Sequence, residues 1–244
     1  MKKKIMSIAV ITIFGLIAAC TKEPSYDVVF PLPDTVSNSS SIESKASSSN
    51  EQQATSNPSS VLISVPFQSQ APFKNWDPLH EEACEEASLI LVARYLNGQS
   101  ISEQEMEEEI QALVAWEHEH GYGEDVTAGQ ILEIAKEYYG LNGRLIDNVS
   151  AATLKAELIA GNPVIIPAAG RMLGNPYYSG LGPPYHMIVV TGFGVRNFIT
   201  QDVGTRRGER YPYNEDVLID AIHDWTGDKE TIETGAKRMV VLYR

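Results

Sequence analysis

The chain has 244 residues, 43% of them hydrophobic, and its 32 Asp and Glu outnumber its 19 Lys and Arg to give a formal net charge of −13. This length and composition suit one globular domain with additional tails, and they exclude a collagen, a coiled coil and a membrane protein with many spans. The negative charge would repel phosphate backbones, and no basic run interleaved with aromatic residues offsets it. Nucleic acid is therefore excluded as a partner.

The N-terminus has the layout of an export signal. A cationic start, Lys2 to Lys4, precedes a largely apolar segment over residues 5–17 that is too short to span a bilayer comfortably. The segment ends in Ile17-Ala18-Ala19-Cys20, which resembles the lipobox of bacterial lipoproteins. We therefore predict a lipoprotein signal peptide over residues 1–19, lipidation of Cys20, and an extracytoplasmic protein anchored in a membrane of a bacterial cell envelope. The alternative is an ordinary signal peptide that happens to contain a cysteine.

A low-complexity segment follows. Residues 37–60 contain eleven serines in 24 residues, with few apolar side chains. Such a segment cannot bury enough surface to fold, so we predict that residues 20–60 form a flexible tether. A glycosylated stalk or a docking segment is the alternative. From residue 61 to residue 244 the composition is that of one globular domain.

Helices are predicted in the first half of this domain and strands mainly in the second. After a strand at Val61–Phe67, the expected helices run from Asp77-Pro78 to Leu96, from the capping box of Ser102 and Glu105, from that of Thr127 and Gln130, and over 151–160. The expected later elements are strands at 164–166, 186–191, 197–201 and 238–243, and a helix near 215–225. Helices followed by a mainly antiparallel sheet indicate the α+β class. Residues 170–185 form the one long irregular stretch, which could be a wall or lid of a site.

Cys84 is the first candidate for a functional residue. Once Cys20 is lipidated, Cys84 is the only thiol left in an exported protein, and it has no partner for a disulfide within the chain. It falls in the first turns of a predicted helix, where unpaired backbone N–H groups and the helix dipole favour a thiolate. The alternative is a small buried hydrophobic residue.

A nucleophilic thiol needs a base, and His186 is the candidate among five histidines. We expect His80, His118, His120 and His223 at the surface, whereas His186 opens an apolar strand. If the following hairpin turns about Gly194, residues 186 and 202 lie directly opposite each other, and the Asp202 carboxylate reaches the imidazole. A structural His–Asp pair at a sheet end is the alternative.

The oxyanion that forms when a thiolate attacks a carbonyl needs a hydrogen-bond donor. Gln68 and Gln70 are the candidates upstream of the cysteine. Strand alternation would point both side chains the same way, so spacing does not choose between them.

Four segments together resemble a known family. The order Gln, Cys, His, Asp resembles the papain-fold cysteine peptidases, and the segments 65–70, 84–89 and 185–192 with Asp202 are more closely similar to the bacterial cysteine peptidase family 39, in its stand-alone branch. The prototypes of that family cleave the leader peptides of bacteriocins. The resemblance implies a papain-like fold, with Cys84 as nucleophile, His186 as general base and acid, Asp202 as the residue that orients it, and Gln70 as oxyanion donor.

One motif departs from the family. The usual Cys-Gly-Pro is here Cys84-Glu85-Glu86, and Glu81 and Glu82 precede it. Nearby carboxylates disfavour a thiolate, so these side chains either point to solvent or leave ionisation of the thiol to His186.

The sequence thus predicts a membrane-anchored cysteine peptidase or amide hydrolase that acts on peptides, without a cofactor and as a monomer. The acidic body favours basic or neutral peptides as substrates. The alternative is a non-catalytic lipoprotein that binds a peptide or a partner on a papain-like scaffold. A metal site at His118 and His120 has little support, because residues two apart on a helix face different ways.

Overall fold

The computed structural model describes residues 58–244, which belong to one compact unit that spans 54–244. The predicted signal peptide, Cys20 and most of the predicted tether lie outside the described residues. None of the helices within 58–244 has the length and apolar character needed to cross a membrane.

The elements follow the predicted order of helices and strands. The helices are α1 (Pro78–Glu82), α2 (Cys84–Leu96), α3 (Glu103–Glu119), α4 (Ala128–Tyr139), α5 (Ala151–Ile159), α6 (Gly170–Leu173), α7 (Glu215–Ala221) and the 3-10 helix η1 (Ile232–Thr234). The strands are β1 (Val61–Leu62), β2 (Asn142–Asp147), β3 (Val164–Ala169), β4 (Tyr185–Phe193), β5 (Asn197–Gln201), β6 (Tyr211–Asn214) and β7 (Arg238–Tyr243). The α+β class is confirmed.

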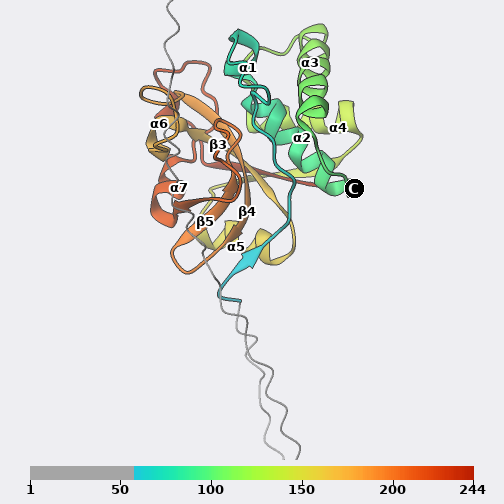
Figure 1. The fold of residues 1–244 in the computed structure, drawn as a ribbon. Helices are drawn as coiled ribbons and strands as arrows, with labels where there is room; N and C mark the ends of the chain where they lie inside the picture. Colours follow the sequence, from blue (N-terminus) through green and yellow to red (C-terminus); the bar gives the residue numbers. More distant parts are fainter. Residues whose placement is uncertain (1–57) are drawn as a thin grey trace, which may run out of the picture. The chain divides into compact units, whose positions relative to one another are not determined.

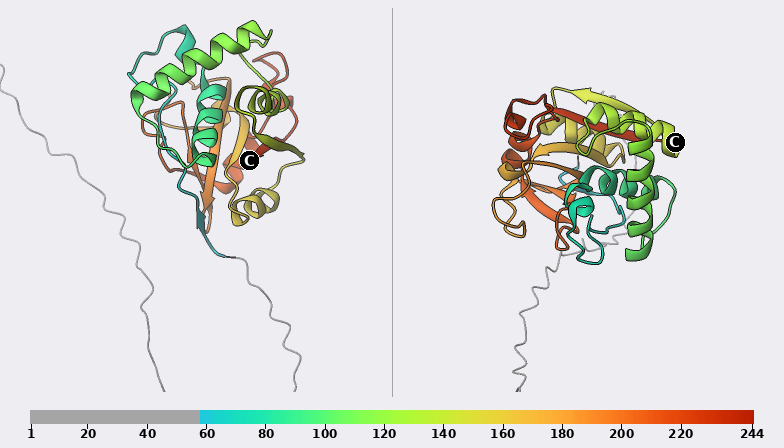
Figure 2. Two further views of the ribbon diagram at one scale, coloured as in Figure 1. Left: turned by 90° about the vertical axis from the view of Figure 1, so that its right-hand side faces the viewer. Right: turned by 90° about the horizontal axis from the view of Figure 1, so that it is seen from above.

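The strands form one antiparallel sheet in the order β2-β7-β3-β4-β5-β6, and β1 pairs with β4. Helices α2, α3 and α4 gather on one side of the sheet, whereas α6 and α7 lie on the other (Figure 1). Every residue of β3 and β4 is buried, as expected for central strands covered on both faces. Figure 2 shows α2 running alongside the sheet, which places the start of α2 near the start of β4.

Local hydrogen bonds explain where the helices begin. Ser102 and Thr127 both form the predicted capping boxes, with Glu105 and Gln130. The predicted helix from Pro78 to Leu96 is two helices rather than one, because the backbone of Ala83 leaves the helical region with φ −86° and ψ 31°. This break makes Cys84 the first residue of α2, as the nucleophile of the predicted chemistry requires.

Several predicted boundaries are wrong. The strand expected at Val61–Phe67 ends at Leu62, because the chain beyond it contacts the sheet only through single hydrogen bonds such as Ile63 N–H to the Thr191 carbonyl. Strands β2 and β6 and the short α6 were not predicted, and the helix expected near 215–225 ends at Ala221, where the chain turns back to β3.

The predicted register of the β4–β5 hairpin is also wrong. Val190 pairs with Thr200 and Gly192 with Ile199, with a bulge between the two pairs. The tight turn is closed by Gly194 N–H to the Asn197 carbonyl, so it is not centred on Gly194. Continued past the end of β5, this register would place residue 204, not 202, opposite 186.

Candidate active site

A pocket of about 520 Å³ opens where the helical part meets the sheet, and it gathers residues from distant parts of the sequence. Cys84, His186 and Gln70 all line it. Tyr177 and Tyr178 also line it, so the irregular stretch 170–185 supplies one wall, as predicted. Gln68 does not line the pocket, and Asp202 is fully buried behind it.

His186 and Asp202 contact each other although the predicted register was wrong. His186 Nε2 lies 2.9 Å from Asp202 Oδ1, and both side chains are buried. The contact is possible because Asp202 lies just after β5, where the chain turns back toward His186. The backbone N–H of Gly204 donates to the same oxygen at 3.1 Å.

The other oxygen of Asp202 accepts three further hydrogen bonds. Tyr213 OH donates at 2.5 Å, Tyr178 OH at 2.8 Å and Asn175 Nδ2 at 2.8 Å. Burial alone would raise the pKa of Asp202, but the hydrogen bond and charge of His186 and the tyrosine hydroxyls hold that pKa below its ordinary value. Asp202 is therefore an anion that can only accept from the imidazole, which places a proton on His186 Nε2 and leaves Nδ1 free to accept another.

Sequence reasoning missed Tyr213 and Asn175 and gave Tyr178 only the role of a wall. Alternation along β6 could have indicated Tyr213, since Tyr211 and Tyr213 both point to one face. Nothing in the sequence indicates that these three side chains converge on one carboxylate, because they come from a loop and a strand far apart in the chain.

Cys84 lies at the start of α2 with 6% of its surface exposed. Its thiol donates a 2.8 Å hydrogen bond to Oε2 of Glu85. Burial raises the pKa of the Cys84 thiol well above its usual range, and the charge of Glu85 adds to this, while the backbone N–H of Met187 opposes it. In the unliganded protein the thiol is therefore protonated at neutral pH.

The carboxylates around the thiol divide into two pairs. Glu81 and Glu82 on α1 are exposed or half-buried, whereas Glu85 and Glu86 are buried, with 1% and 4% of their surfaces exposed. Burial raises the pKa of Glu85 well above its usual range, and the charge of Glu86 adds to this. Oε1 of Glu85 also accepts from the Val126 backbone N–H at 3.3 Å. Of the two alternatives, the one in which the carboxylates point to solvent is therefore wrong for Glu85 and Glu86.

Glu86 meets a second buried acid, Glu117 of α3. Burial raises the pKa of Glu86 well above its usual range, with the charge of Glu117 second, and burial raises the pKa of Glu117 to about 7. Like charges in a buried site disfavour each other, so at most one of the two carboxyl groups is ionised at neutral pH.

Gln70 is buried at the side of the pocket. Its Nε2 donates to the carbonyls of His80 at 2.8 Å and Glu81 at 3.2 Å, so both of its amide hydrogens are used within the protein. An oxyanion could take one of them only by replacing the longer contact. In this arrangement neither amide hydrogen is available to an oxyanion, and the side-chain oxygen Oε1 is buried without a hydrogen-bond partner among the described residues.

The remaining histidines do not reach the pocket. His118 and His120 are exposed, as expected. His80 is buried, not on the surface as expected, because Asp77 at 2.8 Å and Glu107 at 3.1 Å pair with its ring. His223 is half-buried beyond the end of α7 and lies 2.9 Å from the Gly235 carbonyl. Within residues 58–244 no group of three or more His, Cys, Asp or Glu side chains is placed to hold a metal ion.

Chemically, the pocket brings together a thiol, an imidazole with a buried carboxylate behind it, and a side-chain amide. This is the set of groups that cysteine-dependent acyl transfer uses.

Comparison with known proteins places the chain among peptidases. The model of the Peptidase C39-like family matches residues 62–230. No curated protein matches the chain. Among solved structures, a protein from Bacillus anthracis described as a C39-like peptidase aligns with a TM-score of 0.50 and 14% identity, over 76% of this chain and 98% of its own.

Two other solved structures align less well. A double glycine motif protease from an AMS/PCAT transporter, in complex with the leader peptide, has a TM-score of 0.43, 17% identity, and coverage of 75% of this chain and 93% of its own. The cysteine protease CMS1MS2 of Carica candamarcensis, in complex with E-64, has a TM-score of 0.40, 13% identity, and coverage of 77% and 99%.

The family match covers more than half of the chain and includes Cys84, His186 and Asp202. The chain therefore has a cysteine peptidase-like scaffold, and it belongs to the C39-like peptidase family.

Proposed function

We propose that the protein is an extracytoplasmic, lipid-anchored cysteine peptidase that hydrolyses peptide bonds with Cys84, His186, Asp202 and Gln70. The observation that carries this proposal is the 2.9 Å hydrogen bond between His186 Nε2 and Asp202, beside a pocket that Cys84 also lines. A buried imidazole held by a charged carboxylate, next to the one thiol of the described residues, is costly to maintain without a use.

In the proposed reaction, His186 Nδ1 takes the proton of the Cys84 thiol and the sulfur attacks the carbonyl carbon of the substrate. The charge that develops on the carbonyl oxygen is stabilised by a backbone N–H at the start of α2 and by Gln70, whose longer contact with the Glu81 carbonyl must first be released. When the C–N bond breaks, the imidazolium gives its proton to the leaving amine. A water molecule activated by His186 then hydrolyses the thioester, which releases a carboxylic acid and restores the thiol.

The contact between Cys84 and Glu85 requires one step before this reaction. In the free protein the thiol donates to Glu85, so it must turn from that carboxyl group to the imidazole. Binding of a substrate would remove water from the pocket and so destabilise the ionised form of the Glu85 carboxyl group. A neutral carboxyl group binds the thiol less strongly, which allows the thiol to turn to His186. In the proposed enzyme Cys84 is therefore a poor nucleophile until substrate binds.

The experiment that tests the function is cleavage of a complex peptide mixture by the full-length chain, with new termini identified by mass spectrometry. We expect cleavage by wild type and by His118→Ala, whose imidazole is exposed, and at least about a 10³-fold loss in Cys84→Ala and His186→Ala. Equal product in wild type and Cys84→Ala would contradict the proposal.

The contact between Cys84 and Glu85 also favours a second candidate, a non-catalytic protein that binds peptides on this scaffold. For such a protein no peptide would be cleaved, and peptide binding would be the same in wild type and Cys84→Ala. The two candidates thus differ in a single measurement.

The anchor is a separate part of the proposal and rests on the lipobox-like Ile17-Ala18-Ala19-Cys20. In a bacterial host, metabolic labelling with a fatty acid should label the chain, and Cys20→Ser should abolish both the label and sedimentation with membranes. Unlabelled wild-type protein would refute the anchor without affecting the proposed chemistry.

A further inference from the structure

The pocket contains two arginines that the proposed chemistry does not use. Arg206 and Arg207 line it together with Lys229, and both arginines are exposed. Lys229 is paired with Glu82 at 2.8 Å and with Asp125 at 3.3 Å, so its charge is balanced. Within residues 58–244, neither arginine forms an ion pair with an acidic side chain.

A short turn holds these arginines in place. The backbone N–H of Asp202 donates to the Gly208 carbonyl at 3.0 Å, and Gly208 N–H donates to the Thr205 carbonyl at 3.2 Å. The Arg207 backbone N–H is bonded to Thr205 Oγ1 at 3.2 Å, and its guanidinium lies 4.9 Å from the centre of the Tyr177 ring. The turn is thus closed by the same residue that holds the catalytic imidazole.

The position of the turn indicates which part of a substrate it would meet. A Cβ atom at Gly204 would lie 2.8 Å from His186 Cε1, so the turn lies directly against the imidazole. The proton of His186 must go to the amine that leaves, and therefore the substrate segment on the C-terminal side of the cleaved bond passes the imidazole. Arg206 and Arg207 are two and three residues further along the same turn.

We propose that Arg206 and Arg207 form a subsite that binds a carboxylate of the substrate segment on the C-terminal side of the cleaved bond. This inference rests on the proposed function. The carboxylate is either that of an Asp or Glu side chain or the C-terminal carboxylate of a short substrate, and guanidinium groups bind both in the same way. The net charge of the chain favours basic or neutral peptides, and Glu81, without an ion pair among the described residues, also lines the pocket. On the turn that lies against His186, however, the unpaired charges are those of the two arginines.

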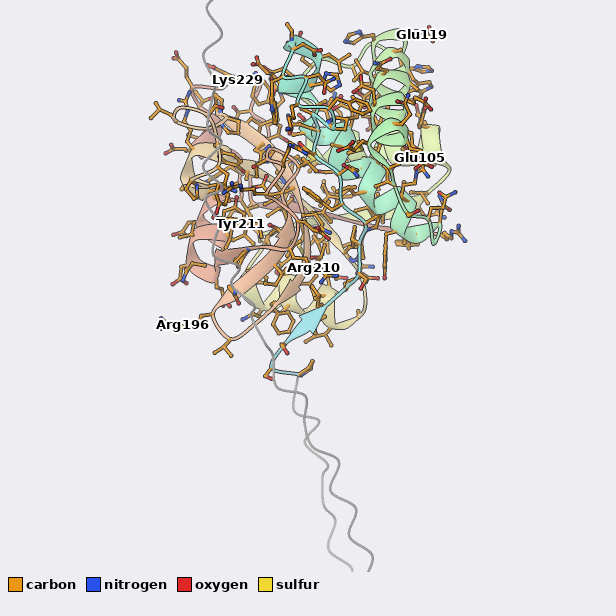
Figure 3. All side chains as sticks on the ribbon, in the orientation of Figure 1. Glu105, Glu119, Arg196, Arg210, Tyr211 and Lys229 are labelled. Atoms are coloured by element: carbon orange, nitrogen blue, oxygen red, sulfur yellow. The ribbon has the colours of Figure 1, made fainter. Side chains whose placement is uncertain are left out.

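The experiment uses matched peptides built on one cleaved sequence. The segment after the cleaved bond carries Glu, Gln or Lys, and each peptide is made with a free and with an amidated C-terminus. The proteins are full-length wild type, the double variant Arg206→Glu/Arg207→Glu, and the control Arg196→Glu. Arg196 is exposed and lies at the far end of the molecule from Lys229, which lines the pocket (Figure 3).

For wild type and Arg196→Glu, we expect kcat/KM to be about tenfold higher for one peptide that carries the carboxylate than for the matching Gln or amidated peptide. In the double variant we expect this preference to be lost or reversed. A preference for Glu over Gln identifies a side-chain carboxylate, and a preference for the free over the amidated terminus identifies a terminal one. Equal rates across the set in wild type, or a preference that persists in the double variant, would overturn the subsite.

Binding of the same labelled peptides to full-length Cys84→Ala, with and without the two charge reversals, separates the two proposals. Absence of cleavage by wild type would refute the peptidase. The carboxylate preference in binding, and its loss on charge reversal, would still decide the subsite. Melting curves that match those of Arg196→Glu establish that the double variant is folded.

Discussion

The thiol of Cys84 donates a 2.8 Å hydrogen bond to the carboxyl group of Glu85, its own neighbour in α2. The resemblance to family 39 leads one to expect a glycine at this position, which would leave the sulfur to the imidazole. With glutamate there, the thiol is bonded to a buried carboxyl group, and its pKa is raised by burial and by the charge of that group.

Replacing Glu85 by Gln should make Cys84 more reactive. The change removes the carboxyl group to which the thiol donates, and with it any charge on Glu85 that raises the pKa of the thiol, while it keeps an oxygen that can accept from the Val126 N–H. We expect alkylation of Cys84 by iodoacetamide at pH 7 to be severalfold faster, because a lower pKa of the thiol increases the fraction present as the reactive thiolate. Mass spectrometry of the peptide that contains Cys84 measures this rate separately from Cys20. Glu81→Gln removes an exposed carboxylate nearby and should change nothing; equal rates in Glu85→Gln and wild type would refute the role of Glu85.

Tyr213→Phe should weaken the hold on Asp202. It removes a 2.5 Å hydrogen bond to a charged, buried carboxylate, which should cost about 2 kcal/mol in the free energy of unfolding at pH 7. Because the folded-state pKa of Asp202 is lowered, its stabilising contribution is present above the unfolded value of 3.8 and is lost as pH falls through the folded value. Without Tyr213 this loss should begin at higher pH in acid denaturation curves. Tyr211→Phe, in the same strand, is the control. If Tyr213→Phe and Tyr211→Phe unfold at the same pH in acid denaturation, the prediction is contradicted.

Gly204→Ala should displace the imidazole. The added Cβ would lie 2.8 Å from His186 Cε1 and 2.9 Å from Nε2, closer than such contacts allow. We expect a loss of roughly 10- to 100-fold in kcat/KM with a much smaller effect on the melting temperature, because a shift of about 1 Å in a catalytic group is enough for such a loss. Gly129→Ala in α4, where the nearest atom is 3.7 Å away, should keep full activity. Full activity of Gly204→Ala would show that the imidazole has room to move.

Glu117→Gln should stabilise the protein near neutral pH. The folded-state pKa of Glu117 is raised from 4.5 to about 7, so the unfolded chain binds fewer protons between these values and stability falls as pH rises through this window. In Glu117→Gln the free energy of unfolding should no longer fall with pH through this window. At pH 7 it should be up to about 3 kcal/mol higher than in wild type. Urea denaturation at pH 4.5, 6 and 7.5 measures the slope. Glu119→Gln removes an exposed carboxylate from the same helix (Figure 3) and should leave it unchanged; the same slope in Glu117→Gln and wild type would refute the buried pair.

The sequence by itself determined the features that depend on neighbouring residues. Capping boxes at Ser102 and Thr127 start helices through hydrogen bonds that span three residues, and they are found as predicted. Alternating and continuous apolar runs indicated β4, β5 and β7 within a few residues. The pairing of His186 with Asp202 was predicted too, but from a register that the bulge in the hairpin makes wrong.

Only the tertiary structure decided what surrounds each of these groups. Glu85 and Glu86 are indistinguishable from exposed glutamates in the sequence, and they are buried because α2 lies between the sheet and α3. Tyr178 and Tyr213 reach Asp202 from separate elements, and Lys229 pairs with Glu82 across 147 positions of the chain. Such contacts depend on how whole helices and strands pack against each other. The resulting burial shifts the pKa of each group, and a local pattern of residues does not predict that burial.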